Sequence, residues 1–163
     1  LVGHSERKNA LGETDEQINK KTKSLLRNGV KTVLCVGEKE REGKDIPETV
    51  GEQLKKALLG VKLSEITHLI VAYEPVWAIS TNPGARPDTP ASALQALLYI
   101  RRILTDLYGK TAAAKIKIIY GGSVNSQNIS GFLEEGRMEG VLVGGASLKP
   151  KEFIEIVEKA AKM

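Results

Sequence analysis

Four short apolar runs, separated by longer segments with apolar side chains at helical spacing, set the pattern of this chain. The runs are rich in β-branched side chains and lie at residues 32–36, 69–73, 116–120 and 140–143. Nearly continuous apolar runs of this length are typical of strands buried on both faces of a parallel sheet. Leu1 and Val2 have the same character and predict the end of one further strand.

Five helices are predicted between and after these runs. Thr14 and Gln17 have the spacing of a capping box, and Thr89 is followed by Pro90 as an N-cap is by a proline at the first helical position. The other helices are expected near residues 50–58, after Asn125 and from about Pro150 onward. The side chains that we expect these helices to bury are Ile18, Thr22, Leu25 and Leu26; Val50, Leu54, Ala57 and Leu58; Leu97, Ile100, Leu104 and Leu107; Ile129, Phe132 and Leu133; and Phe153, Val157, Ala160 and Ala161.

The predicted elements alternate as a strand end, a helix and then four strand–helix pairs. Strict alternation implies parallel strands joined by right-handed helical crossovers. No linker or composition shift divides the 163 residues, so we expect one domain over residues 1–163. The stretch 79–89 contains Pro83, Gly84 and Pro87 and is expected to be a long loop, of the kind that forms lids and binding loops.

Composition narrows the classes of protein to which the chain can belong. The net charge of +4 comes from Lys and Arg interspersed with Glu, and aromatic residues make up 4%, so we expect no nucleic-acid partner. No apolar run approaches the roughly 20 residues of a membrane helix, so we expect no membrane partner. The single Cys35 excludes an internal disulfide and indicates a cytoplasmic protein. No metal-ligand spacing or nucleotide motif occurs, so neither a metal nor a cofactor is expected.

Two glycine pairs follow the last two apolar runs. Gly121 and Gly122 precede Ser123, and Gly144 and Gly145 come directly after residues 140–143. Tight turns between strand and helix need glycine in any case, but glycines there also let backbone N–H groups approach an oxyanion. Phosphate sites built from the last two loops recur in eight-stranded β/α barrels. Two successive pairs therefore favour an anion site.

Titratable side chains also follow strands. Glu74 comes after the run 69–73 and stands beside apolar neighbours, which predicts a raised pKa and a role as general base, although a solvated loop glutamate is the alternative. His4 follows the first strand end and is either catalytic or simply bonded to backbone. Glu6 and Arg7 could form an ion pair that fixes their turn. Cys35 is expected to be a small core residue.

Four segments together closely resemble the triosephosphate isomerase family. They are GHSER at residues 3–7, AYEPVWAI at 72–79, YGGSV at 120–124 and LVGGASL at 142–148. Their order and spacing fit along all 163 residues, and GETDE at 12–16 and VGE at 36–38 match as well. The segment 72–79 is highly specific, whereas the glycine motifs alone are not. It argues against a different phosphosugar barrel enzyme.

The resemblance implies an α/β fold, here an incomplete (β/α)8 TIM barrel made of the end of strand 4 plus βα units 5 to 8. It also implies a cofactor-free isomerase of glycolysis and gluconeogenesis that interconverts dihydroxyacetone phosphate and glyceraldehyde 3-phosphate. By the same resemblance, Glu74 is the base, His4 polarises the carbonyl as neutral imidazole, and Glu6 supports the site. The residues that correspond to the phosphate site are Ser80, Ser123, Gly144 and Gly145.

The sequence departs from the family in two respects. Ser80 occupies a position where the family commonly has glycine. Thr89 and Pro90 come three residues later than in the common form of the family, so the loop at 79–89, which corresponds to the lid, is longer. The first three βα units, with a substrate-binding lysine and a dimer-forming loop, have no counterpart. We therefore expect a truncated chain with little or no turnover unless the N-terminal part is supplied. The alternative is a partial-barrel protein without activity, and in either case we expect a homo-oligomer formed through exposed sheet edges or through the missing barrel part.

Overall fold

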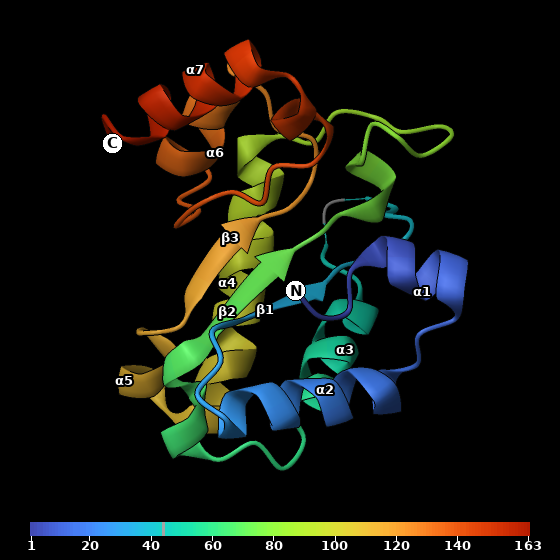
Figure 1. Cartoon of the computed structure of the whole chain (residues 1–163), viewed down its shortest axis with the longest axis vertical. Coiled ribbons are helices and arrows are strands. Elements are labelled where there is room, and N and C mark those ends of the chain that lie inside the picture. The colour runs from blue at the N-terminus through green and yellow to red at the C-terminus, as the bar shows by residue number, and fades with distance from the viewer. Residues whose placement is uncertain (44) are drawn as a thin grey trace.

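A three-stranded parallel sheet runs through the centre of the protein, shown in Figure 1 as a computed structural model that describes residues 1–43 and 45–163. The strands stand in the order β1-β2-β3 and comprise β1 (Thr32–Val36), β2 (Leu69–Tyr73) and β3 (Lys117–Tyr120). Leu34 of β1 is opposite Val71 of β2, which is opposite Ile118 of β3. Three of the four predicted strands and their parallel pairing are confirmed.

The fourth predicted strand, at residues 140–143, is wrong. Only one isolated bridge, between Val141 and Tyr120, forms there. The backbone of Tyr120 bonds to Gly140 O at 3.0 Å and to Leu142 N at 2.7 Å, and the chain then turns away. Within the described residues Glu139 N also donates to Ile118 O at 2.9 Å, so a few backbone bonds join this segment to β3 without making it a strand. At the opposite edge, the predicted strand end is a similar single bridge from Val2 to Leu34.

A glutamate strengthens the edge beside β3. The carboxylate of Glu139 accepts hydrogen bonds from the backbone N–H of Ile118 at 2.9 Å, from Lys117 at 3.2 Å and from Arg101 at 2.7 Å. Partial burial opposes ionisation, but these bonds outweigh it and hold the pKa of Glu139 below its ordinary value. The ionised carboxylate therefore ties the segment before Val141 to the sheet.

The five predicted helices are present, with the bounds α2 (Asp15–Arg27), α3 (Glu48–Leu58), α4 (Pro90–Tyr108), α6 (Ile129–Glu134) and α7 (Pro150–Ala160). The capping box of Thr14 and Gln17 forms in full, and Thr89 caps α4 by accepting from Ser92 N. The sequence did not predict the short elements α1 (Ser5–Leu11), α5 (Lys110–Ala113), η1 (Leu63–His68), η2 (Val76–Ala78) and η3 (Gly145–Leu148).

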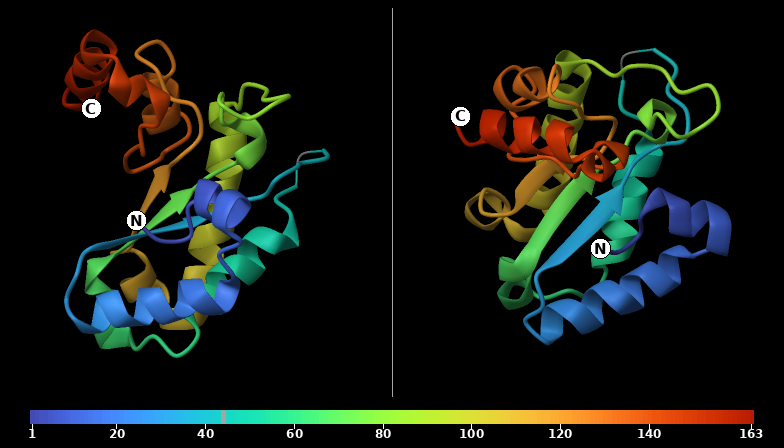
Figure 2. Two further views of the ribbon diagram at one scale, coloured as in Figure 1. Left: turned by 45° about the vertical axis from the view of Figure 1, so that its right-hand side comes forward. Right: turned by 45° about the horizontal axis from the view of Figure 1, so that its top comes forward.

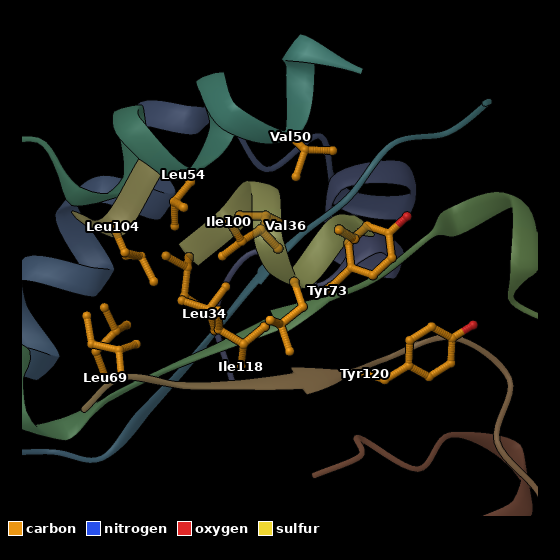
Figure 3. Close-up of a cluster of buried hydrophobic side chains, with 14 of the residues drawn as sticks. Leu34, Val36, Val50, Leu54, Leu69, Tyr73, Ile100, Leu104, Ile118 and Tyr120 are labelled. Carbon is orange, nitrogen blue, oxygen red and sulfur yellow. The ribbon is translucent and has the colours of Figure 1, made fainter. Parts of the chain in front are cut away.

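The core lies on one face of the sheet. Helices α3 and α4 cover this face, as Figure 3 shows, and their side chains meet the strand residues that point toward them. Leu34, Val71 and Ile118 are fully buried there. On the other face Val33, Ile70 and Ile119 are only half-buried. Cys35 and Ala72 on that same face are buried, so the expectation of strands buried on both faces is confirmed fully for one face and in part for the other.

Helices α6 and α7 lie together beyond β3, on the side of the sheet away from α1 and α2 (Figures 1 and 2). The apolar face predicted for α7 is wrong, because Phe153 is 39% and Val157 51% exposed while Ile156 is buried. This helix packs on α6 and η3 and not on the sheet, which selects a different set of side chains. In α4 the predicted burial of Leu107 is also wrong: it is 42% exposed, and Ile103 is buried instead.

Candidate active site

A cavity of about 600 Å³ opens at the carboxyl ends of the strands. Loops that follow Val2, β2, β3 and Val141 form its walls, so residues far apart in the sequence meet there. All seven residues singled out in the sequence line it, namely His4, Glu6, Glu74, Ser80, Ser123, Gly144 and Gly145.

The imidazole of His4 and the carboxylate of Glu74 form a direct pair in this cavity. The His4 Nε2 atom lies 2.8 Å from Glu74 Oε1, and the backbone N–H of Ser5 donates to Glu74 Oε2 at 3.0 Å. Glu74 is 2% exposed, and its own N–H donates to Val36 O at 2.8 Å, which fixes its backbone at the end of β2. The base candidate is thus buried and held by both oxygens.

The segment predicted as a turn at residues 4–7 is instead the start of helix α1. His4 is the N-cap residue of this helix, and its Nδ1 atom accepts from Glu6 N at 3.4 Å. A backbone N–H can only donate, so Nδ1 carries no proton and the proton of the neutral imidazole sits on Nε2. His4 therefore presents an N–H donor to Glu74 and to the cavity.

Burial raises the pKa of Glu74 above its ordinary value. The positive charge of His4 in its protonated form and the hydrogen bond from Ser5 N act in the opposite direction without outweighing burial. A carboxylate with a raised pKa is a stronger base, as predicted from its apolar neighbours. The alternative of a solvated loop glutamate is wrong, because the side chain is buried.

Glu6 is placed less favourably than predicted. Its side chain is 81% exposed, and Oε2 lies 3.9 Å from His4 Nδ1. The suggested ion pair with Arg7 is also wrong, because the Arg7 Nε atom donates to Glu13 Oε1 at 3.1 Å, where Lys21 donates as well. Although burial opposes it, these bonds lower the pKa of Glu13 and keep it ionised. Glu13, in the linker between the two helices, thus ties Arg7 of α1 to Lys21 of α2.

The four predicted anion-binding residues all line this same cavity. The backbone N–H of Ser80 donates to Ser123 Oγ at 2.7 Å, so the loop after β2 touches the loop after β3. A Cβ atom added at Gly144 or Gly145 would meet nothing within 4 Å, which means that these glycines leave the cavity wide open.

Gly121 has a different purpose from the one predicted for the glycines after β3. An added Cβ at Gly121 would lie 2.9 Å from Glu74 Cγ, and one at Gly122 would lie 2.3 Å from the hydroxyl oxygen of Tyr120. The N–H of Gly121 is already bonded to Tyr73 O at 2.7 Å. Gly121 therefore gives room to the side chain of Glu74 rather than an N–H to an anion.

Sequence reasoning missed the residues that anchor the lid-like loop at 79–89. Glu38 Oε1 accepts from Trp77 Nε1 at 2.9 Å and from the hydroxyl of Tyr73 at 2.8 Å. The guanidinium of Arg86 lies 4.9 Å from the Trp77 ring centroid, within cation–π range. Glu38 follows β1 just as Glu74 follows β2, so its position in the sequence indicated that it lies near Glu74 at the carboxyl ends of the strands.

At the far end of this loop, Asp88 Oδ2 accepts from the hydroxyl of Tyr120 at 3.2 Å. Its other oxygen accepts from Thr89 N at 2.8 Å, next to the start of α4. Arg86 and Asp88 both lie near the far end of the loop, where Arg86 contacts Trp77 of η2 and Asp88 contacts Tyr120 at the end of β3.

Two other kinds of site find no support in the described part of the chain. Among its His, Cys, Asp and Glu side chains, no group of three or more is placed to hold a metal ion. No helix in the same residues is long and apolar enough to cross a membrane. The buried Cys35 thiol has a raised pKa caused by burial, as expected for a core residue.

Parallel strands joined by helices, with titratable side chains gathered at the carboxyl ends of the strands, define an α/β protein of the β/α-barrel class. The family model for triosephosphate isomerase matches residues 1–160. The chain belongs to the triosephosphate isomerase family, and the fold is part of a TIM barrel.

Curated relatives agree with this assignment. A triosephosphate isomerase from Dictyoglomus turgidum is 44% identical over 159 residues, which cover 96% of this chain and 63% of that protein. One from Caldanaerobacter subterraneus subsp. tengcongensis is 45% identical over 159 residues with the same coverage. A third, from Mycoplasmoides gallisepticum, is 44% identical over 160 residues, covering 97% of this chain and 62% of the relative. The chain thus spans about 63% of the length of the curated relatives that it matches.

Proposed function

We propose that this chain provides the proton-transfer half of a site that interconverts dihydroxyacetone phosphate and glyceraldehyde 3-phosphate. Glu74 takes the proton from one carbon and returns it to the next, and His4 polarises the carbonyl. These are the roles for which the family is known, taken over through the resemblance. The observation that carries the proposal is the 2.8 Å contact between His4 Nε2 and the buried Glu74 carboxylate.

The arrangement of the pair suits this chemistry. Burial raises the pKa of Glu74, so its carboxylate is a stronger base than a solvated one. The hydrogen bond from Glu6 N places the imidazole proton on Nε2, the atom that faces Glu74. A substrate that enters between them replaces their mutual bond and meets a proton acceptor and a hydrogen-bond donor together. The exposed Glu6 carboxylate, 3.9 Å from His4 Nδ1, would support the reaction through His4.

The four predicted anion-binding residues would bind the phosphate of the substrate. Ser80 contributes its backbone N–H, Ser123 its hydroxyl, and Gly144 and Gly145 the open backbone that lines the cavity. Backbone N–H groups in such loops are suited to oxyanions. Closure of the loop at 79–89 would then exclude water from the proton transfer.

The second candidate is a partial-barrel protein that self-associates and has no activity. The half-buried sheet face with Val33 and Ile119 favours self-association, as do the single-bridge edges at Val2 and Val141. We propose that the chain forms homo-oligomers through these surfaces in the cytoplasm, where its lone cysteine stays reduced. Sedimentation should show a dimer or larger species, and a well-behaved monomer would refute this.

Turnover decides between the two candidates. The purified chain is mixed with triose phosphate, first alone and then with a fragment that carries the first three βα units of a relative. We expect activity only in the mixture, and Glu74→Gln should remove it by about 10²-fold or more. No turnover in a mixture that demonstrably assembles would refute the isomerase proposal. Rapid turnover by the chain alone would show that its own residues suffice.

A further inference from the structure

Glu74 also lines a second, much smaller cavity of about 40 Å³. Its lining includes Ser5 and Lys8 of α1, Gln53 of α3, and Gly37, which follows β1. Of these residues, Ser5 is the one with a hydrogen bond to the Glu74 side chain. Lys8, Gln53 and Gly37 are joined to one another, and Gly37 packs against the Glu74 backbone.

The first step is the close approach of Gly37 to Glu74. A Cβ atom added at Gly37 would lie 1.8 Å from Glu74 O and 2.5 Å from its carbonyl carbon. The two backbones therefore pack with no room between them, and any movement of Gly37 moves Glu74. The neighbouring bond from Glu74 N to Val36 O, at 2.8 Å, belongs to the same contact.

The second step is the amide of Gln53, which holds both backbone groups of Gly37. Gly37 N donates to Gln53 Oε1 at 3.0 Å, and Gln53 Nε2 donates to Gly37 O at 3.0 Å. A side-chain amide that makes two such bonds fixes the backbone of Gly37 on both sides of its Cα atom. Helix α3 thereby sets the position of the segment that packs against the base.

The third step is Lys8, whose Nζ atom donates to Gln53 Oε1 at 3.2 Å. Both the ammonium and the Gly37 N–H can only donate, so they exclude the flipped orientation of the amide. Lys8 lies on α1 three residues after Ser5, whose N–H binds the Glu74 carboxylate at 3.0 Å. One helix thus contacts the base directly and, through Gln53, indirectly.

The charges around this group are mixed. Glu74 faces His4, Lys8 and Glu6, and the thiol of Cys35 lies nearby. Burial lowers the pKa of Lys8, and the carboxylates of Asp15, Glu74 and Glu13 oppose that effect. Two lysines line the small cavity together with Glu74, and of these Lys8 is half-buried whereas Lys39 is exposed.

We propose that Lys8 and Gln53 are positioning residues for Glu74. Gln53 fixes Gly37 against the backbone of the base, while Lys8 orients the Gln53 amide and places a positive charge behind the carboxylate. The catalytic significance of this assignment rests on the proposed function, but the arrangement itself can be tested without turnover.

The test is a pH titration of the Glu74 carboxyl carbon by nuclear magnetic resonance in the full chain, assigned by the signal that Glu74→Gln removes. We expect Lys8→Met to raise the pKa of Glu74 by about 1 pH unit, because a nearby cation is lost. Lys8→Arg should leave it near the wild-type value. Lys31→Met, at the exposed residue before β1, is the matched control for net charge and should change nothing.

The positional part is tested by hydrogen exchange at the Gly37 amide. Gln53→Met keeps the volume but removes both bonds, and we expect Gly37 N–H to exchange at least about fivefold faster, which corresponds to the loss of one net hydrogen bond. Should Lys8→Met fail to fold, Lys8→Gln removes the charge while it keeps a donor for Gln53. The pKa of Glu74 in Lys8→Gln should then be higher than in the wild type.

An unchanged Glu74 titration in Lys8→Met or Lys8→Gln would overturn the charge assignment, as would an equal change in Lys31→Met. Unchanged exchange at Gly37 in Gln53→Met would overturn the positioning assignment. In a preparation that turns over, Lys8→Met should also move the acid limb of the kcat/KM profile to higher pH. Absence of turnover refutes the proposed function alone, since the titration does not depend on it.

Discussion

Replacing Gly37 with alanine is the sharpest single perturbation that the structure offers. The added Cβ would lie 1.8 Å from Glu74 O, 2.5 Å from its carbonyl carbon and 3.1 Å from its Cα. All three atoms are backbone, so no side chain can rotate away. The shortest separation must grow from 1.8 Å to at least 3.0 Å, and one of the two backbones therefore shifts by about 1.2 Å.

Two costs follow from that displacement. Overpacking of a tight site typically lowers the free energy of unfolding by about 1–3 kcal/mol. The shift also strains the bonds from Glu74 N to Val36 O at 2.8 Å and from Gly37 N to Gln53 at 3.0 Å, each with a net contribution of about 1 kcal/mol. We expect Gly37→Ala to be destabilised by about 3 kcal/mol. In an active preparation, a base misplaced by about 1 Å should reduce kcat about 10²-fold.

Urea unfolding followed by circular dichroism measures the stability change. Gly145→Ala is the matched control, because a Cβ there meets nothing within 4 Å, and its stability should stay within about 0.5 kcal/mol of wild type. The reasoning is refuted if Gly37→Ala unfolds at the same urea concentration as Gly145→Ala. That result would mean that the strand ends are free to separate at no cost.

Three further predictions test other parts of the structure. Leu104→Ala, at a fully buried side chain, should lower the free energy of unfolding by about 2–5 kcal/mol, whereas Leu107→Ala on the same helix, 42% exposed, should change it by less than about 0.5 kcal/mol. Glu139→Gln should cost about 1 kcal/mol at pH 7 after allowance for solvent screening. Because the folded pKa of Glu139 is depressed, urea titrations should show this difference shrinking as the pH falls below about 4.5 and vanishing below the folded value; a difference constant with pH would contradict the assignment. Arg86→Ala removes the cation over Trp77, the single tryptophan, and should shift its fluorescence emission to the red as water reaches the ring; an unchanged spectrum would show that Arg86 does not cover it.

Local patterns predicted those elements whose formation depends on local contacts. The capping box of Thr14 and the Thr89–Pro90 start needed only neighbouring residues, and both helices begin where expected. The segment 140–143 had the composition of a strand, but a strand also needs a partner, and only Val141 pairs. Helix α1 was missed because its N-cap is His4, a residue outside the usual capping set.

In the candidate site, too, the sequence predicted what depends on local position and missed what depends on distant contacts. Position after a strand was enough to single out His4 and Glu74, because parallel strands bring their carboxyl ends to one edge. Their 2.8 Å contact joins residues 70 positions apart, and no spacing rule contains it. For α7, periodicity favoured Phe153 over Ile156, but the choice between two apolar faces depends on which neighbour the helix meets.

The bond between Ser80 N and Ser123 Oγ makes anion binding an exchange reaction. An anion in this cavity does not meet a free donor at Ser80, because the N–H is already bonded at 2.7 Å. Replacing that bond subtracts about 1 kcal/mol from the affinity, or roughly a factor of five in Kd. The same contact already ties Ser80 to the loop after β3, so less ordering entropy is lost at Ser80 on binding. The Ser80–Ser123 bond therefore lowers the affinity for an anion because it must be broken, and raises it because Ser80 is already ordered.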